Sequence, residues 1–142
     1  MKEKLEIQGV MTPFPHSIGI DQTLQVAKQM MQKYGVRHLP VQDGGRLVGI
    51  LSNHDIDFAL AVDDKKPEEI LVEATYTAEP YVVELTADVA TIANKMAHDH
   101  ISCALVMQRE KLVGIFTTVD VCRTLAQVLR NEAPAANVAN EN

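Results

Sequence analysis

The chain has 142 residues, of which 46% are hydrophobic, and a formal net charge of −6 at pH 7. This length fits one ordinary domain or two small halves that share a core. The acidic balance argues against a nucleic-acid surface, and no apolar run approaches the ~20 residues that span a bilayer. The charged N-terminus lacks the apolar core of a secretory signal. Cys103 and Cys122 lie in apolar runs, which indicates reduced cysteines in a cytoplasmic protein.

In chain order, the first half predicts a strand, a helix, a β-hairpin and a second helix. The run 17–20 follows a Pro-marked turn and suits an edge strand. Asp21 can N-cap the next helix, whose apolar residues recur at helical spacing, and Gly35 suits its C-cap. The remaining elements are a strand over 37–41, an Asp-Gly turn within 42–45, a second strand and a helix over about 53–62.

The second half predicts the same series of elements. Its strand covers 82–85, Thr86 can N-cap the first helix, and apolar residues from Val89 to Met96 repeat at helical spacing. A strand over 102–106, a hairpin turn over 108–110 and a helix over about 118–130 follow. We expect a charged linker over 63–71 and a disordered tail over 131–142, so that the halves cover 7–62 and 72–130.

A short motif occurs in both halves, 65 positions apart. Gly49–Asp55 reads GILSNHD and Gly114–Asp120 reads GIFTTVD, so each copy places a hydroxyl residue three positions before an Asp. Helix capping alone explains that spacing in a single copy. The duplication is wider, however, because residues 10–60 align on 75–125 without a gap. Each half is therefore a β-α-β-β-α unit of α/β class, and we expect the two units to pack sheet against sheet as a pseudo-twofold module.

These repeats resemble a tandem pair of CBS domains, the regulatory module named after cystathionine β-synthase. The resemblance rests on the Thr-x-x-Pro segments, the Met-containing helices, the His-Leu-Pro-Val strand of the first half and both copies of the Gly-apolar-apolar-Ser/Thr-x-x-Asp motif. It covers residues ~7–130 and implies two clefts between the halves, with AMP, ADP, ATP or S-adenosylmethionine as ligand. It also implies a homodimer of pairs.

The resemblance assigns roles to the motif residues. Asp55 and Asp120 would accept hydrogen bonds from ribose hydroxyls, since a carboxylate is an acceptor-only group with two oxygens. Ser52 and Thr117, each at a helix start, would contact phosphate.

Each implied cleft combines one half's motif with the other half's first strand and central-strand start. Asp120 and Thr117 would then face one set of residues: Thr12, Pro13, Pro15, His16, Arg37 and His38. Asp55 and Ser52 would face a second set: Thr77, Glu79, Pro80, Ser102 and Cys103. Because the second set includes the anion Glu79 and departs from the Leu-Pro pattern at Ala104-Leu105, we expect one competent cleft, built on Asp120.

No catalytic or metal constellation is found in the sequence. Ser52 and His54 are too close along a helix start to point at one another, and a Gly-Lys-Ser/Thr phosphate loop is absent. His98 and His100 lie near a helix end without a completing Cys or carboxylate.

The leading hypothesis is a stand-alone CBS pair, cytoplasmic and homodimeric, that binds an adenosine nucleotide and signals to an unidentified partner. It is not an enzyme and requires no cofactor on this hypothesis. One alternative is a ligand-free dimerisation or protein-interaction module in which both motifs only cap helices. The other is a small enzyme or metal sensor that uses the histidines.

Overall fold

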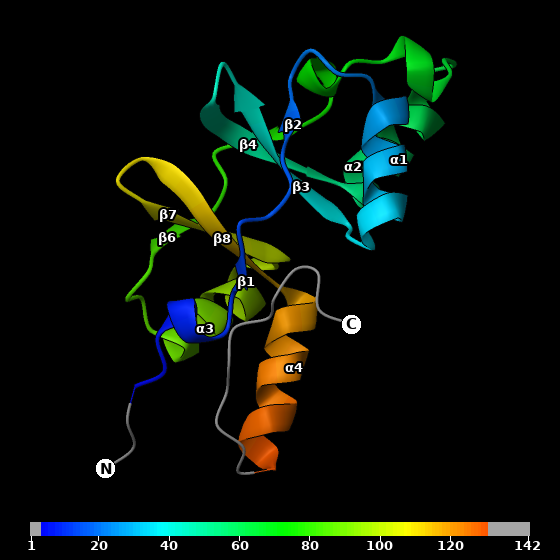
Figure 1. Cartoon of the computed structure of the whole chain (residues 1–142). Coiled ribbons are helices and arrows are strands. Elements are labelled where there is room, and N and C mark those ends of the chain that lie inside the picture. Colours follow the sequence, from blue (N-terminus) through cyan, green and yellow to red (C-terminus); the bar gives the residue numbers. More distant parts are fainter. Residues whose placement is uncertain (1–3, 131–142) are drawn as a thin grey trace. The chain divides into compact units, whose positions relative to one another are not determined.

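The computed structural model describes residues 4–130 and forms two compact units (Figure 1). Among the described residues, one unit contains residues 16–80, and the other combines residues 4–15 with residues 81–130. The boundaries of the compact units therefore differ from those of the sequence repeats, because each repeat's first segment belongs to the unit of the other repeat.

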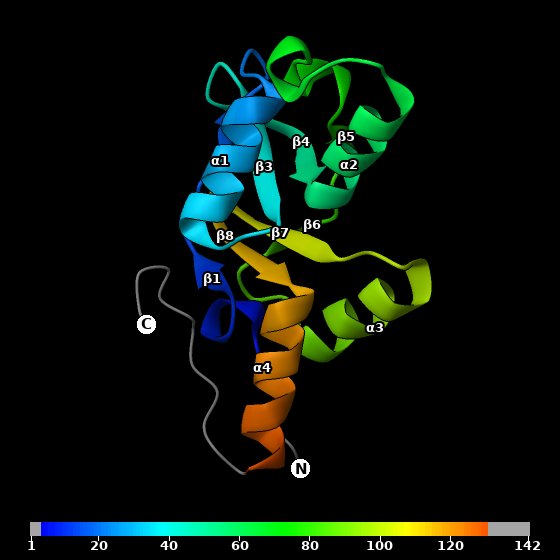
Figure 2. The same cartoon turned by 90° about the vertical axis from the view of Figure 1, so that its right-hand side faces the viewer.

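The 16–80 unit is a four-stranded sheet with two helices on one side (Figures 1 and 2). The sheet order is β2-β3-β4-β5, with β2 parallel to β3 and the other pairs antiparallel. Its elements are β2 (Ile18–Gly19), α1 (Leu24–Tyr34), β3 (His38–Asp43), β4 (Arg46–Ser52), α2 (Asn53–Val62), the 3-10 helices Pro67–Glu69 and Val72–Ala74, and β5 (Thr77–Ala78).

The second unit has the same architecture, with sheet order β1-β8-β7-β6. β6 is parallel to β7, and the other pairs are antiparallel. Its elements are the 3-10 helix Ile7–Gly9, β1 (Thr12–Pro13), β6 (Val82–Glu84), α3 (Val89–Asp99), β7 (Cys103–Gln108), β8 (Lys111–Thr117) and α4 (Thr118–Leu129). In Figure 1 the blue strand β1 lies beside β8 although about 100 residues separate them.

A glycine in each motif strand lets the incoming strand approach closely. A Cβ at Gly49 of β4 would collide with the carbonyl oxygen of Thr77, and one at Gly114 of β8 would collide with Sδ of Met11. Any side chain at these positions would collide with the exchanged segment. The motif glycines therefore have a packing role at the two strand pairings that join the repeats.

Each unit has its own apolar core beneath its sheet. In the second unit, the N-terminal residues Ile7 and Val10 are 0% and 3% exposed and join the cluster around Phe116. The core of the 16–80 unit contains Leu24, Leu39 and Leu51, all 0% exposed. The N-terminal segment is thus a structural part of the second repeat's unit.

The sequence-based prediction of the N-caps is wrong for the first helix of both repeats. Thr23, not Asp21, caps α1 by accepting a hydrogen bond from the Val26 amide, and Asp88, not Thr86, caps α3 by accepting one from Thr91. The cause is non-local, because Thr23 bridges Leu71 and Asp88 bridges Glu6 through the backbone, which sets where each helix begins. The predicted Gly35 C-cap is confirmed, with φ 65°.

The predicted hairpins are present in both units. Gly44 and Gly45 occupy the first turn with positive φ, whereas Arg109 and Glu110 adopt φ 50° and 65° in the second without being glycines. The tail predicted over 131–142 lies outside the described residues. Within residues 4–130, none of the helices has the length and apolar character needed to cross a membrane.

Candidate functional site

Three segments meet at the N-terminus of α4 in the second unit. Thr117 ends β8 and precedes the helix, Asp120 lies in its first turn, and Thr12 of β1 donates a hydrogen bond to Asp120 Oδ1 at 3.1 Å. The third segment is the start of β7, where the carbonyl oxygen of Ser102 accepts a hydrogen bond from the Thr118 amide at 3.1 Å. Strand pairing therefore delivers a hydroxyl, a carboxylate and the polar start of a helix to one place.

Asp120 is buried, with its side chain 4% exposed, and both carboxylate oxygens accept hydrogen bonds. Oδ1 accepts from Thr12 and from Nη1 of Arg123 at 2.8 Å. Oδ2 accepts from the Thr117 amide at 2.9 Å and from the Thr117 hydroxyl at 3.3 Å. A carboxylate has about four lone-pair sites, so all of its acceptor capacity is in use.

The equivalent carboxylate in the 16–80 unit has looser contacts. Asp55 is half-buried and accepts one short hydrogen bond, from the Ser52 amide at 3.0 Å, within a reciprocal capping box. The hydroxyl of Thr77 is 3.4 and 3.5 Å from its two oxygens. The residue in the position of Arg123 is Phe58, which is 71% exposed. Among the described residues, the ion pair at Asp120 has no counterpart at Asp55.

His38 is half-buried and lies opposite Ser52 in the β3–β4 ladder. Burial lowers the pKa of its imidazole below the ordinary value of 6.5, the charge of Asp55 opposes that change, and His54 adds to it. His38 is therefore neutral at pH 7, and it offers hydrogen bonds rather than a full positive charge beside Asp55.

Both Thr-x-x-Pro segments contain a backbone outlier at the same place. Phe14 has φ 48° and Glu79 has φ 58°, and each immediately precedes a proline. Non-glycine residues rarely adopt this conformation, and such outliers gather at functional sites. The two segments are therefore held in an unusual shape beside the motif carboxylates, with the ring of Phe14 74% exposed.

The predicted ligand residues divide between the two units. Asp120, Thr117 and Ser102 belong to the second unit with Thr12, Pro13 and Pro15, whereas Asp55 and Ser52 share the 16–80 unit with His16, Arg37, His38, Thr77 and Pro80. The sequence predicts that His16, Arg37 and His38 lie near Asp120 and that Ser102 lies near Asp55. Each of these contacts would join residues of different units, and it stays a prediction. Within its own unit, His16 stacks on Tyr34 with ring centroids 3.6 Å apart.

Arg123 was missed by sequence reasoning, and so was the exposed Phe14. The signal for Arg123 was present in the alignment of the repeats. It stands three residues after the motif Asp, at a spacing where helical side chains meet, and its counterpart is the apolar Phe58.

The histidines and cysteines form no second site in residues 4–130. No group of three or more His, Cys, Asp or Glu in residues 4–130 is arranged to hold a metal ion. His98 contacts Asp99 at 2.8 Å on the surface. Both cysteines are free, and burial raises the pKa of Cys103 to about 12, so its thiol is protonated and unreactive at neutral pH.

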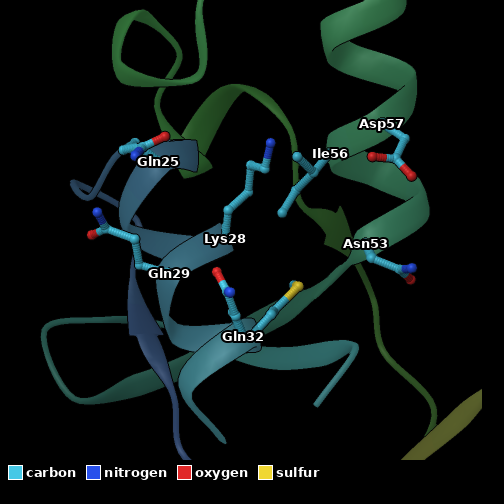
Figure 3. A pocket seen from close by; sticks show the side chains of 8 residues that line it. Gln25, Lys28, Gln29, Gln32, Asn53, Ile56 and Asp57 are labelled. Carbon is cyan, nitrogen blue, oxygen red and sulfur yellow. The ribbon is translucent and has the colours of Figure 1, made fainter. Parts of the chain in front are cut away.

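A cavity of about 380 Å³ lies between α1 and α2 (Figure 3). Polar side chains and the apolar side chains of Met31 and Ile56 line it, and none of these residues is predicted to bind the ligand. The lining residues are Gln25, Lys28, Gln29, Met31, Gln32, Asn53, Ile56 and Asp57. The cavity is open and carries no convergent set of polar groups comparable with that around Asp120.

The chain is a tandem module of two β-α-β-β-α repeats, each completed by a strand of the other. Each repeat contributes one of two related motif sites. A family model of the CBS domain matches residues 6–62 and 72–127. The chain therefore belongs to the CBS domain family, as a tandem pair.

Similar proteins include an enzyme and a small protein. The chain is 30% identical over 119 residues to L-aspartate semialdehyde sulfurtransferase of Methanocaldococcus jannaschii, covering 82% of this chain and 22% of the enzyme. It is 27% identical over 111 residues to hypoxic response protein 1 of Mycobacterium tuberculosis, covering 78% of each. The first match spans about a fifth of the enzyme's length.

Among solved structures, a similar fold is the CBS domain pair of protein MJ0100 in complex with 5′-methylthioadenosine and S-adenosyl-L-methionine. The TM-score is 0.80 at 26% identity, covering 89% of this chain and 99% of that chain.

Proposed function

We propose that this chain is a non-catalytic regulatory module that binds an adenosine nucleotide (AMP, ADP or ATP) or S-adenosylmethionine and reports it to a partner protein. The observation that supports this most directly is the meeting of a carboxylate, a hydroxyl and a Thr-x-x-Pro segment at the N-terminus of a 12-residue helix. The adenosine ligands of the similar CBS pair support the choice of ligand.

The chemistry of the site matches the two polar parts of such a ligand. Asp120 can accept the hydroxyl hydrogens of a ribose once some of its present donors are released. Thr117 stands at the start of α4, and the first turn of this helix favours an anion because the positive end of the helix dipole lies there. Phe14, with its positive φ, lies in the same Thr-x-x-Pro segment as Thr12, which contacts Asp120.

Signalling would follow from the exchange of strands between the repeats. A ligand held by β1, β7 and α4 contacts segments from both sequence repeats. It can shift the module between conformations only by as much as its affinities for them differ. The proposal includes a cytoplasmic location, in keeping with the two free cysteines, and a homodimer.

The homodimer is supported by apolar side chains left exposed on the two motif helices. α2 exposes Phe58 and Val62, and α4 exposes Val119, Leu125, Val128 and Leu129, each more than half accessible. On each helix, exposed apolar residues four positions apart share a face, Phe58 with Val62 and Leu125 with Leu129, and exposed apolar faces are typical of interaction sites.

The first test is calorimetric titration of the purified protein with AMP, ADP, ATP and S-adenosylmethionine. Asp120→Ala should raise the Kd of the ligand at least roughly tenfold, because a hydrogen bond to a charged group contributes about 1.5 kcal/mol or more. Asp120→Asn repeats the test with the side-chain size kept, and circular dichroism verifies that each variant is folded.

Asp57→Ala is the matched control, because Asp57 is an exposed acid on the other motif helix and makes no cap. It should bind as the wild type does. Unchanged binding by Asp120→Ala would contradict the proposed site.

A ligand-free interaction module is the second candidate function. It is favoured by the saturation of Asp120 and by the capping box at Ser52, since both motifs already have a structural use. This alternative predicts that none of the four ligands changes the melting temperature. A bound ligand at a hundred times its Kd would instead add about 2.7 kcal/mol to stability.

A further inference from the structure

The two motif carboxylates differ in one ion pair that the repeat does not preserve. Nη1 of Arg123 lies 2.8 Å from Oδ1 of Asp120, and the Arg123 side chain is 40% exposed while that of Asp120 is 4% exposed. The equivalent pair in the 16–80 unit is Phe58 and Asp55, which cannot form an ion pair. Any ligand that uses the two carboxylates therefore meets two different electrostatic environments.

A ribose cannot bind Asp120 without removing donors that are already there. The Thr117 amide is held by the start of the helix, and the Thr117 hydroxyl shares Oδ2 with it. On Oδ1 the donors are the Thr12 hydroxyl and the guanidinium of Arg123. Of these four donors, Arg123 has the longest and most flexible side chain, so it is the group that a ribose hydroxyl most readily displaces.

Displacing Arg123 separates an ion pair, and the cost depends on what the guanidinium contacts next. A neutral nucleoside offers it no anion. A phosphate does, because Arg123 and the Thr117 hydroxyl contact the two oxygens of the same carboxylate, so an anion held by Thr117 lies within reach of the guanidinium. Helical side chains also lean toward the helix N-terminus, which brings Arg123 over the first turn of α4.

We propose that Arg123 makes the Asp120 site selective for adenosine ligands that carry a 5′-phosphate over neutral adenosine, whereas the Asp55 site, with Phe58 in that place, lacks this selectivity. This inference rests on the proposed function. It assigns ligand discrimination to a residue outside the shared motif, and it explains why one module would hold two sites of unequal preference.

The repeat supplies the test, because each residue can be exchanged for its counterpart. In an Asp55→Asn background, which leaves the Asp120 site to be measured, Arg123→Phe should tighten adenosine about tenfold, the usual contribution of a charge-assisted hydrogen bond. The affinity for AMP should change little. The variant removes the cost of displacing Arg123 from Asp120, but it also removes the contact that Arg123 would make with the phosphate. The ratio of AMP to adenosine affinity should therefore fall about tenfold.

The reciprocal change is Phe58→Arg in an Asp120→Asn background, which should weaken adenosine at the Asp55 site and raise the preference for AMP. Arg123→Gln is the second variant for the Asp120 site, because it keeps a polar, helix-forming side chain while it removes the guanidinium and its charge. Calorimetric titration gives both affinities for each variant.

The outcomes separate this inference from the proposed function. A wild-type protein that binds AMP, with an AMP-to-adenosine ratio unaffected by Arg123→Phe and Arg123→Gln, would overturn the role of Arg123 and leave the nucleotide site standing. A wild-type protein that binds neither AMP, adenosine, ATP nor S-adenosylmethionine would overturn both.

Discussion

At the residue scale, the two motif aspartates have the same sequence spacing and different surroundings. Asp120 is buried under four donors that include an arginine, whereas Asp55 keeps one short backbone hydrogen bond and a distant threonine. The sequence-based expectation of one competent cleft, built on Asp120, rested on the residues that each cleft would gain. The contacts around each carboxylate add a second criterion for a competent cleft. It is the free-energy cost of releasing the hydrogen-bond donors that a ribose would replace.

His38 predicts a pH dependence of stability at the same scale. Its pKa is lowered in the folded protein, mainly by burial, so the unfolded chain binds more protons on average near and below pH 6.5. The free energy of unfolding should therefore decrease as the pH falls from 7.5 to 5.5. His38→Gln should show a shallower decrease, measured as the melting temperature at each pH.

His98→Gln is the control for that experiment, because the His98 side chain is 86% exposed on the surface. It should retain the wild-type pH dependence below pH 6.5 more fully than His38→Gln does. Equal slopes in the wild type and His38→Gln would show that burial of His38 does not govern acid stability. Asp55 and His54, the charged groups that act on His38, remain in place throughout.

At the element scale, the motif glycines permit the strand pairings that complete each sheet. Gly49 pairs with Ala78 of β5 and Gly114 with Pro13 of β1. The obstacle to a Cβ differs, since it is a backbone carbonyl oxygen and the Tyr76 ring at Gly49, but the flexible Met11 side chain at Gly114.

Gly49→Ala should therefore destabilise the protein by about 1–3 kcal/mol, the usual cost of overpacking. Gly114→Ala should cost less, because Met11 can change rotamer and alanine restricts the unfolded chain, which offsets part of the cost. Urea unfolding of both variants measures the difference. An equal or larger loss in Gly114→Ala would contradict the assignment of the obstacles.

At the scale of the whole molecule, the compact units are made from both repeats. Ile7 precedes the first repeat's strand, yet its side chain is fully buried in the core of the second unit. The strands β1 and β5 are exchanged in the same sense. A substitution in the buried N-terminal segment should therefore destabilise residues 81–130 more than residues 16–80.

Ile7→Ala should destabilise the second unit by about 2–5 kcal/mol, as expected for a truncated core residue. Hydrogen exchange should then rise in β7 and β8 more than in β3 and β4. Leu24→Ala is the matched variant in the other core and should show the opposite distribution. Equal increases in both sheets for both variants would show that the two units open as one.

Much of the architecture is present in local patterns of the sequence. The 65-residue repeat, the helical spacing of apolar residues, the Gly35 cap and the Asp-Gly turn predict the order of elements and the place of both motifs. The helical spacing, the cap and the turn could be predicted because each depends on neighbours within a few positions, where propensity and capping act, and the repeat is visible by direct alignment of the sequence with itself. The family resemblance, which covers both repeats, follows from the same local motifs.

Other features were decided only by the tertiary structure, because they depend on residues far apart in the chain. Thr23 and Asp88 replace Asp21 and Thr86 as caps because distant backbone segments bridge them. The acceptor sites of Asp120 are all occupied only because β1 pairs with β8 and because Arg123 folds back over the first helical turn. Spacing in the sequence placed the Asp120 carboxylate and its nearby donors in Thr117 and Arg123, each three residues away. The Thr12 hydroxyl reaches the same carboxylate across about 100 residues, which no local pattern encodes.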